Sequence, residues 1–80
     1  MLPSVHHRRY LAVQAHLRAL RKSAGLSQVD LATLLHVEQP YVSKLERGER
    51  YVDLLLYFDW CRACGAEPSA AVAALTKKGA

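Results

Sequence analysis

Two cysteines and four histidines are the side chains of this chain best suited to metal or redox chemistry. Cys61 and Cys64 have the Cys-x-x-Cys spacing of zinc sites and thiol–disulfide oxidoreductases. A redox pair of this kind belongs at the beginning of a helix, whereas this one falls near the end of a predicted helix. A zinc site needs two further ligands, and no histidine has finger-like spacing to the pair: His6, His7, His16 and His36. We therefore expect buried thiols, no metal and no cofactor.

No combination of side chains in the sequence predicts catalysis. There is no Ser/His/Asp or Cys/His arrangement with a pocket to hold it, and no glycine-rich phosphate loop. A chain of 80 residues also has no room for a doubly wound sheet or a deep-pocketed barrel. With 51% hydrophobic and 22% charged residues, we expect one small globular domain over residues 1–80 that is not an enzyme.

Basic residues are concentrated in the first part of the chain. Eleven Lys and Arg against seven Asp and Glu give a formal net charge of +4. Residues 1–50 carry eight basic and four acidic side chains, whereas residues 51–80 carry three of each. A polyanion is therefore expected to bind the first part. The longest apolar run, residues 54–58, is too short for a membrane span, and the start does not resemble a signal peptide, so we expect a cytoplasmic protein.

Hydrophobic periodicity predicts an all-α fold. Tyr10, Val13, Leu17 and Leu20 recur at three- and four-residue spacing, which places them on one face of a helix. No stretch alternates as a strand would, and there is no internal repeat. The helices are expected over about residues 6–24, 28–35, 39–46, 54–63 and 70–75, with a core over about residues 10–76.

Polar residues and glycines mark the predicted helix ends. Ser27, with Asp30 three residues later, has the pattern of a capping box for the second helix. Asp53 and Ser69 are expected to cap the fourth and fifth helices. Glycines follow three of the helices, at the position where a helix end favours a residue that tolerates a positive φ: Gly25, Gly48 and Gly65.

The second and third predicted helices form a helix-turn-helix arrangement over about residues 28–46. Ala32 fits this arrangement, because only a methyl group fits where two helices cross at a steep angle. The segments Gly25–Ala32 and Gln39–Arg50 closely resemble the Cro/phage-repressor-like helix-turn-helix family, also called XRE-like regulators. The resemblance extends over about residues 17–68 and includes a Ser-Gln opening and a Ser-Lys-x-Glu-x-Gly-x-Arg close.

The resemblance implies a compact five-helix, lambda-repressor-like domain that binds double-stranded DNA, usually as a symmetric dimer with the third helix in the major groove. It places base-contacting residues at Gln39 and Lys44, with Ser43 beside them. A Gln at the start of that helix can pair with adenine N6 and N7, and a Lys suits guanine O6 and N7 or a phosphate. Phosphate contacts are expected from neighbouring side chains, for each of which an ordinary exposed role is the alternative: Gln28, Tyr41, Arg47 and Arg50.

Two further features concern the scaffold. The resemblance pairs Arg21 with Glu46 in a partly buried salt bridge that would hold the third helix at its angle. His36 stands in the turn where the family usually has Gly, and His adopts a left-handed backbone more easily than a branched residue. Arg8 and Arg9 are either part of a basic arm over residues 1–9 that follows phosphates or the exposed start of the first helix.

The fourth predicted helix is apolar nearly all round, which is more than a single small subunit can bury. We therefore expect a homodimer interface on it, with Leu54, Leu56, Tyr57 and Trp60 as candidates. Repression of transcription is the simplest mechanism, and no small-molecule effector is expected, because the chain after residue 76 is too short for an effector pocket. The alternative is an antitoxin-like or anti-regulator module whose fourth helix binds a partner protein.

Overall fold

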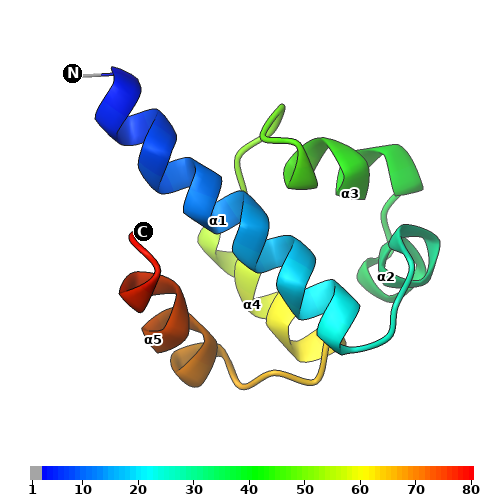
Figure 1. Ribbon diagram of the computed structural model, residues 1–80. Helices are drawn as coiled ribbons and strands as arrows, with labels where there is room; N and C mark the ends of the chain where they lie inside the picture. Colours follow the sequence, from blue (N-terminus) through cyan, green and yellow to red (C-terminus); the bar gives the residue numbers. More distant parts are fainter. Residues whose placement is uncertain (1–2) are drawn as a thin grey trace.

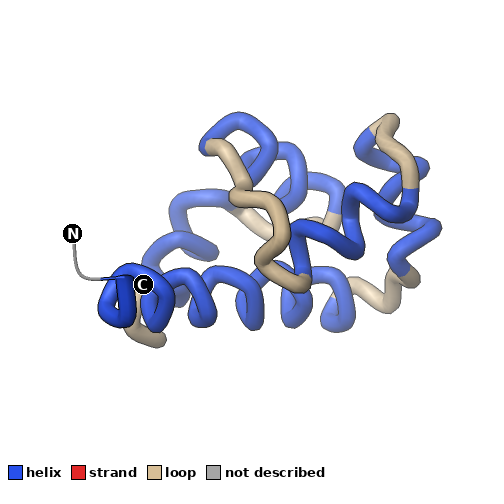
Figure 2. Tube along the Cα trace, turned by 90° about the horizontal axis from the view of Figure 1, so that it is seen from above, coloured by secondary structure: helices blue, strands red, loops and turns tan. Residues whose placement is uncertain are grey.

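Five helices make up the part of the chain that the computed structural model describes, residues 3–80. Their order is α1 (Pro3–Ser23), α2 (Gln28–Leu35), α3 (Gln39–Glu46), α4 (Leu54–Ala63) and α5 (Pro68–Lys77) (Figure 1). All regular structure in this range is helical (Figure 2). The prediction of an all-α fold is therefore confirmed, and the predicted bounds of the three middle helices agree with the structure.

The first and last helices are longer than the sequence predicts. Helix α1 begins at Pro3, so Arg8 and Arg9 belong to a helix and not to an extended arm. Of the arm expected over residues 1–9, residues 1 and 2 lie outside the described part of the chain. Helix α5 begins at Pro68, and its cap is Glu67, whose carboxylate accepts a hydrogen bond from the Ala70 backbone N–H.

The prediction that Ser69 caps the fifth helix is wrong, and Pro68 supplies the reason. Proline has no backbone N–H and a fixed φ, so it fits the first position of a helix, which makes the preceding residue the cap. That preceding residue is Glu67, which satisfies the N–H of Ala70 at 3.1 Å.

The helix-turn-helix segment has well-formed ends. The Ser27 hydroxyl accepts from the Asp30 N–H and the Asp30 carboxylate accepts from the Ser27 N–H, both at 3.0 Å, so the predicted capping box is present. His36 ends α2 with φ 59° and ψ 41°, a left-handed conformation that costs a non-glycine residue some strain. Asp53 caps α4 as predicted, accepting from the Leu56 N–H at 2.8 Å.

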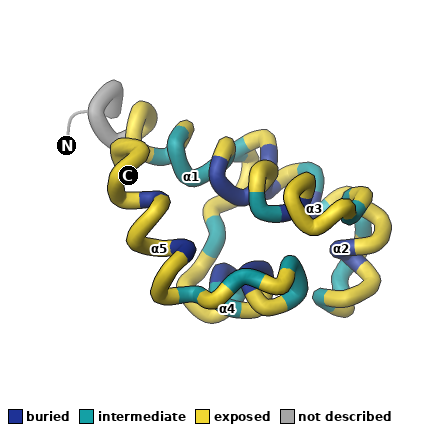
Figure 3. The backbone as a smooth tube through the Cα atoms, turned by 60° about the horizontal axis from the view of Figure 1, so that its bottom comes forward, coloured by how far each residue is buried: buried dark blue, intermediate teal, exposed yellow. Residues whose placement is uncertain are grey.

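All five helices contribute buried side chains to one core (Figure 3). Leu17, Leu45 and Trp60 are fully buried there, and the indole N–H of Trp60 donates to the Leu17 carbonyl at 3.0 Å. Cys61 is also fully buried and Cys64 is half-buried, with both thiols free. Burial raises the pKa of Cys61, and it raises that of Cys64 to about 11, so both are expected to be unreactive thiols.

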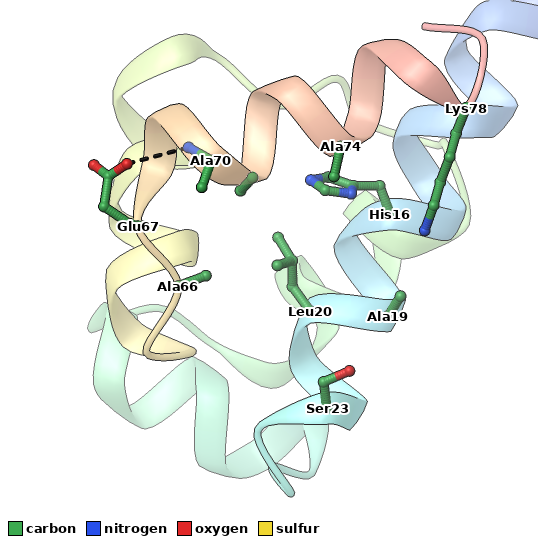
Figure 4. A pocket seen from close by; sticks show the side chains of 10 residues that line it. His16, Ala19, Leu20, Ser23, Ala66, Glu67, Ala70, Ala74 and Lys78 are labelled. Atoms are coloured by element: carbon green, nitrogen blue, oxygen red, sulfur yellow. Dashed lines mark hydrogen bonds between the residues drawn. The ribbon is translucent and has the colours of Figure 1, made fainter.

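Helix α5 packs against α1 across a shallow groove of about 420 Å³ (Figure 4). Small side chains, among them Ala19, Ala70 and Ala74, line most of it. His16 lies in its wall with 5% of its surface exposed, and its Nε2 is 2.8 Å from the hydroxyl of Tyr57 in α4. A buried polar pair therefore joins α1 to α4.

His16 is expected to make stability depend on pH. Burial lowers its pKa, and the nearby charge of Lys78 lowers it further. Between the ordinary pKa of about 6.5 and the lowered folded value, the unfolded chain binds a proton that the folded chain does not, so stability falls as pH decreases. The slope from one group is at most about 1.4 kcal/mol per pH unit.

Urea unfolding between pH 7.5 and 5.5 measures this slope. His16→Gln is expected to remove most of it, whereas His7→Gln, which replaces an exposed imidazole, leaves it intact. An unchanged slope in His16→Gln would contradict the assignment.

Candidate nucleic-acid interface

Helix α3 is held against α2 by its buried face, which leaves the opposite face on the surface. Val42 and Leu45 are fully buried. Ala32 of α2 retains only 4% of its surface at the contact between the two helices, in agreement with its predicted role as a small residue. The Val37 N–H donates to the Ala32 carbonyl at 3.0 Å, which fixes the turn.

Glu46, at the end of α3, has a completely buried side chain and is held by charged partners from α1. Arg21 donates from Nε to Oε2 at 2.7 Å and from Nη2 to Oε1 at 3.0 Å, so the pair is bidentate. Arg18, half exposed, adds a longer contact of 3.6 Å to Oε1. The ion pair that the resemblance implies between the first and third helices is thus present in the structure.

The electrostatics of this cluster keep Glu46 charged. Burial by itself raises the pKa of Glu46, but hydrogen bonds from Arg21 and Gln28 and the charges of Arg21 and Arg18 outweigh burial, and the pKa lies below its ordinary value. The hydrogen bond to Glu46 raises the pKa of Arg21 against the opposing effect of burial. The cluster is therefore an ion pair at neutral pH.

A chain of amide hydrogen bonds extends from this ion pair to the first residue of α3. Gln28 donates from Nε2 to Glu46 Oε1 at 3.1 Å, and Gln39 donates from Nε2 to Gln28 Oε1 at 2.7 Å. This bond uses one of the two N–H donors of Gln39 and leaves its carbonyl oxygen and second N–H for a ligand. The side chain of Gln28 is engaged at both ends, which the sequence did not indicate.

The remaining predicted contact residues lie along α3 and the segment after it. Lys44 is exposed, and Ser43 is half-buried with its hydroxyl accepting from Arg47 Nη1. Arg47 also donates from Nε to Glu49 at 2.7 Å, in an exposed ion pair. The guanidinium of Arg50 lies 5.3 Å from the ring centre of Tyr41, so the two predicted phosphate contacts are neighbours.

Tyr10 and Gln14 of α1 support the loop between α3 and α4, a role that sequence reasoning missed. The Tyr10 hydroxyl accepts from the Val52 N–H at 2.9 Å and donates to the Arg50 carbonyl at 3.3 Å. Gln14 lies over Gly48, where φ is +77° and an added Cβ would be 2.5 Å from Gln14 Oε1. Periodicity marks Tyr10 as a core position, but nothing in the sequence indicates where its hydroxyl points.

The predicted dimer candidates on α4 divide into buried and exposed residues. Tyr57 and Trp60 retain 4% and 0% of their surface, so their assignment to an interface is wrong: both belong to the core. Leu56 is half-buried against the same core. Leu54 is 63% exposed, and its neighbour Leu55 is 72% exposed. The free apolar surface of α4 is therefore confined to its first turn.

Among the side chains of residues 7–80, which the structure describes, no group of three or more His, Cys, Asp and Glu could hold a metal ion. None of the described helices is both long and apolar enough to cross a membrane.

The arrangement of α2 and α3, with α1 and α4 behind them, is that of a helix-turn-helix protein. A family model for a helix-turn-helix domain matches residues 14–75. The fold is similar to an XRE-family like protein from Pseudomonas syringae pv. tomato str. DC3000, with 36% sequence identity and a TM-score of 0.84 over 92% of this chain and 90% of that one. It is also similar to the clp gene regulator ClgR from C. glutamicum, with 30% sequence identity and a TM-score of 0.78 over 90% of this chain and 94% of that one.

No curated protein is a significant match. The family model and the two solved structures agree with the motif resemblance in the sequence. This chain belongs to the XRE-like helix-turn-helix family of DNA-binding transcription regulators.

Proposed function

We propose that this protein binds specific double-stranded DNA sequences as a homodimer, with α3 in the major groove, and represses transcription from the promoter that it occupies. The observation that carries the proposal is the hydrogen-bond chain from Arg21 through Glu46 and Gln28 to Gln39. Base reading requires side chains held close to one geometry by their supporting contacts. This chain supplies that support at the first turn of α3.

The contact residues then have distinct roles. Gln39 presents an oxygen and an N–H, the pair of groups that matches adenine N6 and N7. Lys44, with Ser43 beside it, contacts a base edge or a phosphate further along α3. Arg47, Arg50 and the Tyr41 hydroxyl contact phosphates, which set position and affinity but carry no sequence information. Gln28 acts through Gln39, while the backbone N–H groups at the start of α2 are available to a phosphate.

The homodimer is supported by the exposed first turn of α4. Leu54 and Leu55 are large apolar side chains with most of their surface in solvent. A two-fold axis near them would relate two copies of α3 that occupy major grooves about one helical turn apart. The same surface also favours a second candidate function, an interaction module that binds a partner protein through α4.

Binding to own-promoter and random-sequence DNA across a salt series tests the proposal. Wild type is expected to bind both, with an affinity that falls steeply with salt, and to bind the promoter more tightly. Gln39→Ala is expected to lower promoter affinity about 5- to 150-fold, the equivalent of about 1–3 kcal/mol, and to leave random-sequence binding unchanged. Lys44→Ala should weaken binding more than Lys22→Ala, which removes an exposed lysine on α1.

The mass in solution, measured in parallel, separates the two candidates. A dimer with specific binding supports the regulator. A monomer with weak, sequence-blind binding would contradict an autonomous repressor and favour the interaction module. If Gln39→Ala lowers the affinity for promoter DNA and for random-sequence DNA by the same factor, this residue does not contact a base.

A further inference from the structure

Arg18 of α1 lies beside the buried ion pair of Arg21 and Glu46 but is not needed to complete it. Arg21 donates two hydrogen bonds to the Glu46 carboxylate and Gln28 donates a third, so this buried charge already has its partners. The Nε of Arg18 is 3.6 Å from Glu46 Oε1, which is longer than a hydrogen bond and so does not use any of its five N–H donors. The side chain of Arg18 is 50% exposed, whereas that of Glu46 has no exposed surface.

One positive charge is in excess at this cluster. Glu46 and Arg21 balance each other, and among the ion pairs of the described residues Arg18 has no carboxylate other than Glu46. The pKa of Glu46 agrees with this division, because the hydrogen bonds from Arg21 and Gln28 and the charge of Arg21 each lower it more than the charge of Arg18 does. Arg18 is therefore a half-exposed guanidinium whose charge is available to an anion from outside the chain.

The position of Arg18 places this charge between two parts of the proposed DNA-binding surface. Arg18 and Gln28 approach the same oxygen of Glu46, so Arg18 is next to the first residue of α2. One turn earlier on α1, Gln14 donates to the Glu46 carbonyl at 3.4 Å, so this face of α1 also follows the end of α3. Figure 1 shows α3 above this part of α1. The proposed function assigns phosphates to both places, at the start of α2 and from Arg47 onward.

We propose that Arg18 binds a backbone phosphate of the same DNA, between the phosphates contacted at the start of α2 and those contacted after α3; the inference rests on the proposed function. In that function α3 occupies the major groove, so a side chain on α1, which packs behind α3, reaches the sugar–phosphate backbone and not the base edges. Guanidinium groups bind phosphate oxygens through paired N–H donors, and the contact to Glu46 leaves those of Arg18 available. Arg18 then sets affinity and position but not sequence preference.

Arg18→Gln tests this inference on own-promoter and random-sequence DNA across a salt series. The variant is expected to lose affinity for both DNA types by the same factor, and its salt slope should be smaller by about two, one for each subunit of the dimer. The loss should therefore shrink about tenfold between about 50 and 200 mM salt. Arg18→Lys, which keeps the charge, should keep the slope. The matched control Arg62→Gln removes an exposed arginine from the end of α4 and should leave affinity and slope unchanged.

Urea unfolding distinguishes a phosphate contact from a structural role of Arg18. Because its side chain is half exposed, solvent screens its contact with Glu46, and Arg18→Gln should change the free energy of unfolding little. Lower stability, a weaker preference for the promoter and an unchanged salt slope would overturn the inference, because Arg18 would then act through the ion pair that supports Gln39. Equal losses of affinity in Arg18→Gln and Arg62→Gln would also overturn it, since net charge and not position would be responsible.

The behaviour of wild type separates this inference from the proposed function. If wild type prefers its promoter and Arg18→Gln has the same affinity and salt slope, the inference alone is wrong. If wild type binds both DNA types equally, sequence-specific binding is wrong, while a smaller salt slope in Arg18→Gln still supports the phosphate contact. If wild type binds neither DNA type, the proposed function and the inference are both wrong.

Discussion

Arg21→Ala is expected to lower the free energy of unfolding by about 3–5 kcal/mol, the cost of leaving a buried charge without its partner. The Glu46 side chain has no exposed surface, and Arg21 provides two of its hydrogen bonds. Gln28 and the more distant Arg18 remain, but neither supplies a bidentate charged contact. Because small domains have only about 5–15 kcal/mol of stability, this loss is a large share of the total. Chemical unfolding at neutral pH measures it.

The dependence of this loss on pH identifies its cause. In wild type the pKa of Glu46 lies below its ordinary value, so its contribution is fully present at neutral pH and is lost only as pH falls through that lowered value. Without Arg21, burial dominates and raises the pKa, so the folded variant takes up a proton more readily than the unfolded chain. The stability difference between the two proteins should therefore narrow as pH decreases from 7 toward 4.

Two further variants control for effects other than the buried charge. Arg47→Ala removes an exposed ion pair with Glu49 and is expected to change stability little, because solvent screens such pairs. The double variant Arg21→Ala/Glu46→Gln has a neutral amide in place of the buried, unpaired carboxylate. It should therefore recover part of the lost free energy of unfolding. Equal losses in Arg21→Ala and Arg47→Ala would show that Glu46 tolerates its burial without Arg21.

The elements that the sequence predicts correctly are those whose signals are local. Helices α2 and α4 each have a cap that bonds within three residues, at Ser27 and Asp53. His36 is correctly assigned to a turn that needs a left-handed residue. Two residues could cap α5, Glu67 and Ser69, one on each side of Pro68. The proline decides between them, because it occupies the first position of the helix and makes the residue before it the cap.

Contacts between residues distant in sequence account for what could not be predicted. A helix that is apolar nearly all round, such as α4, does not indicate which of its faces the rest of the fold covers. Tyr57 and Trp60, predicted to lie in an interface, therefore belong to the core. The bond between Gln28 and Gln39 depends on the angle between α2 and α3. The approach of Arg18 to Glu46 depends on where α3 ends against α1. Sequence spacing determines neither geometry.

Trp60→Ala is expected to lower the free energy of unfolding by about 3–5 kcal/mol, the usual cost of removing a large aromatic side chain from a core. Trp60 is fully buried, and the hydrogen bond from its indole N–H to the Leu17 carbonyl links α4 directly to α1. If Trp60 were an interface residue, the loss would instead appear as weaker dimerisation and would depend on protein concentration. Unfolding measured over a hundredfold range of protein concentration distinguishes a core role of Trp60 from an interface role.

Leu55 provides the matched control on the same helix, because it is 72% exposed where Trp60 is completely buried. Leu55→Ala removes little buried surface from a single subunit, so any effect on stability should come from dimerisation and should disappear as the protein is diluted to the monomer. Trp60→Phe should cause a smaller loss than Trp60→Ala, since the ring still fills most of the site while the bond to Leu17 is absent. A concentration-dependent effect in Trp60→Ala, with none in Leu55→Ala, would reverse the assignment of core and interface on α4.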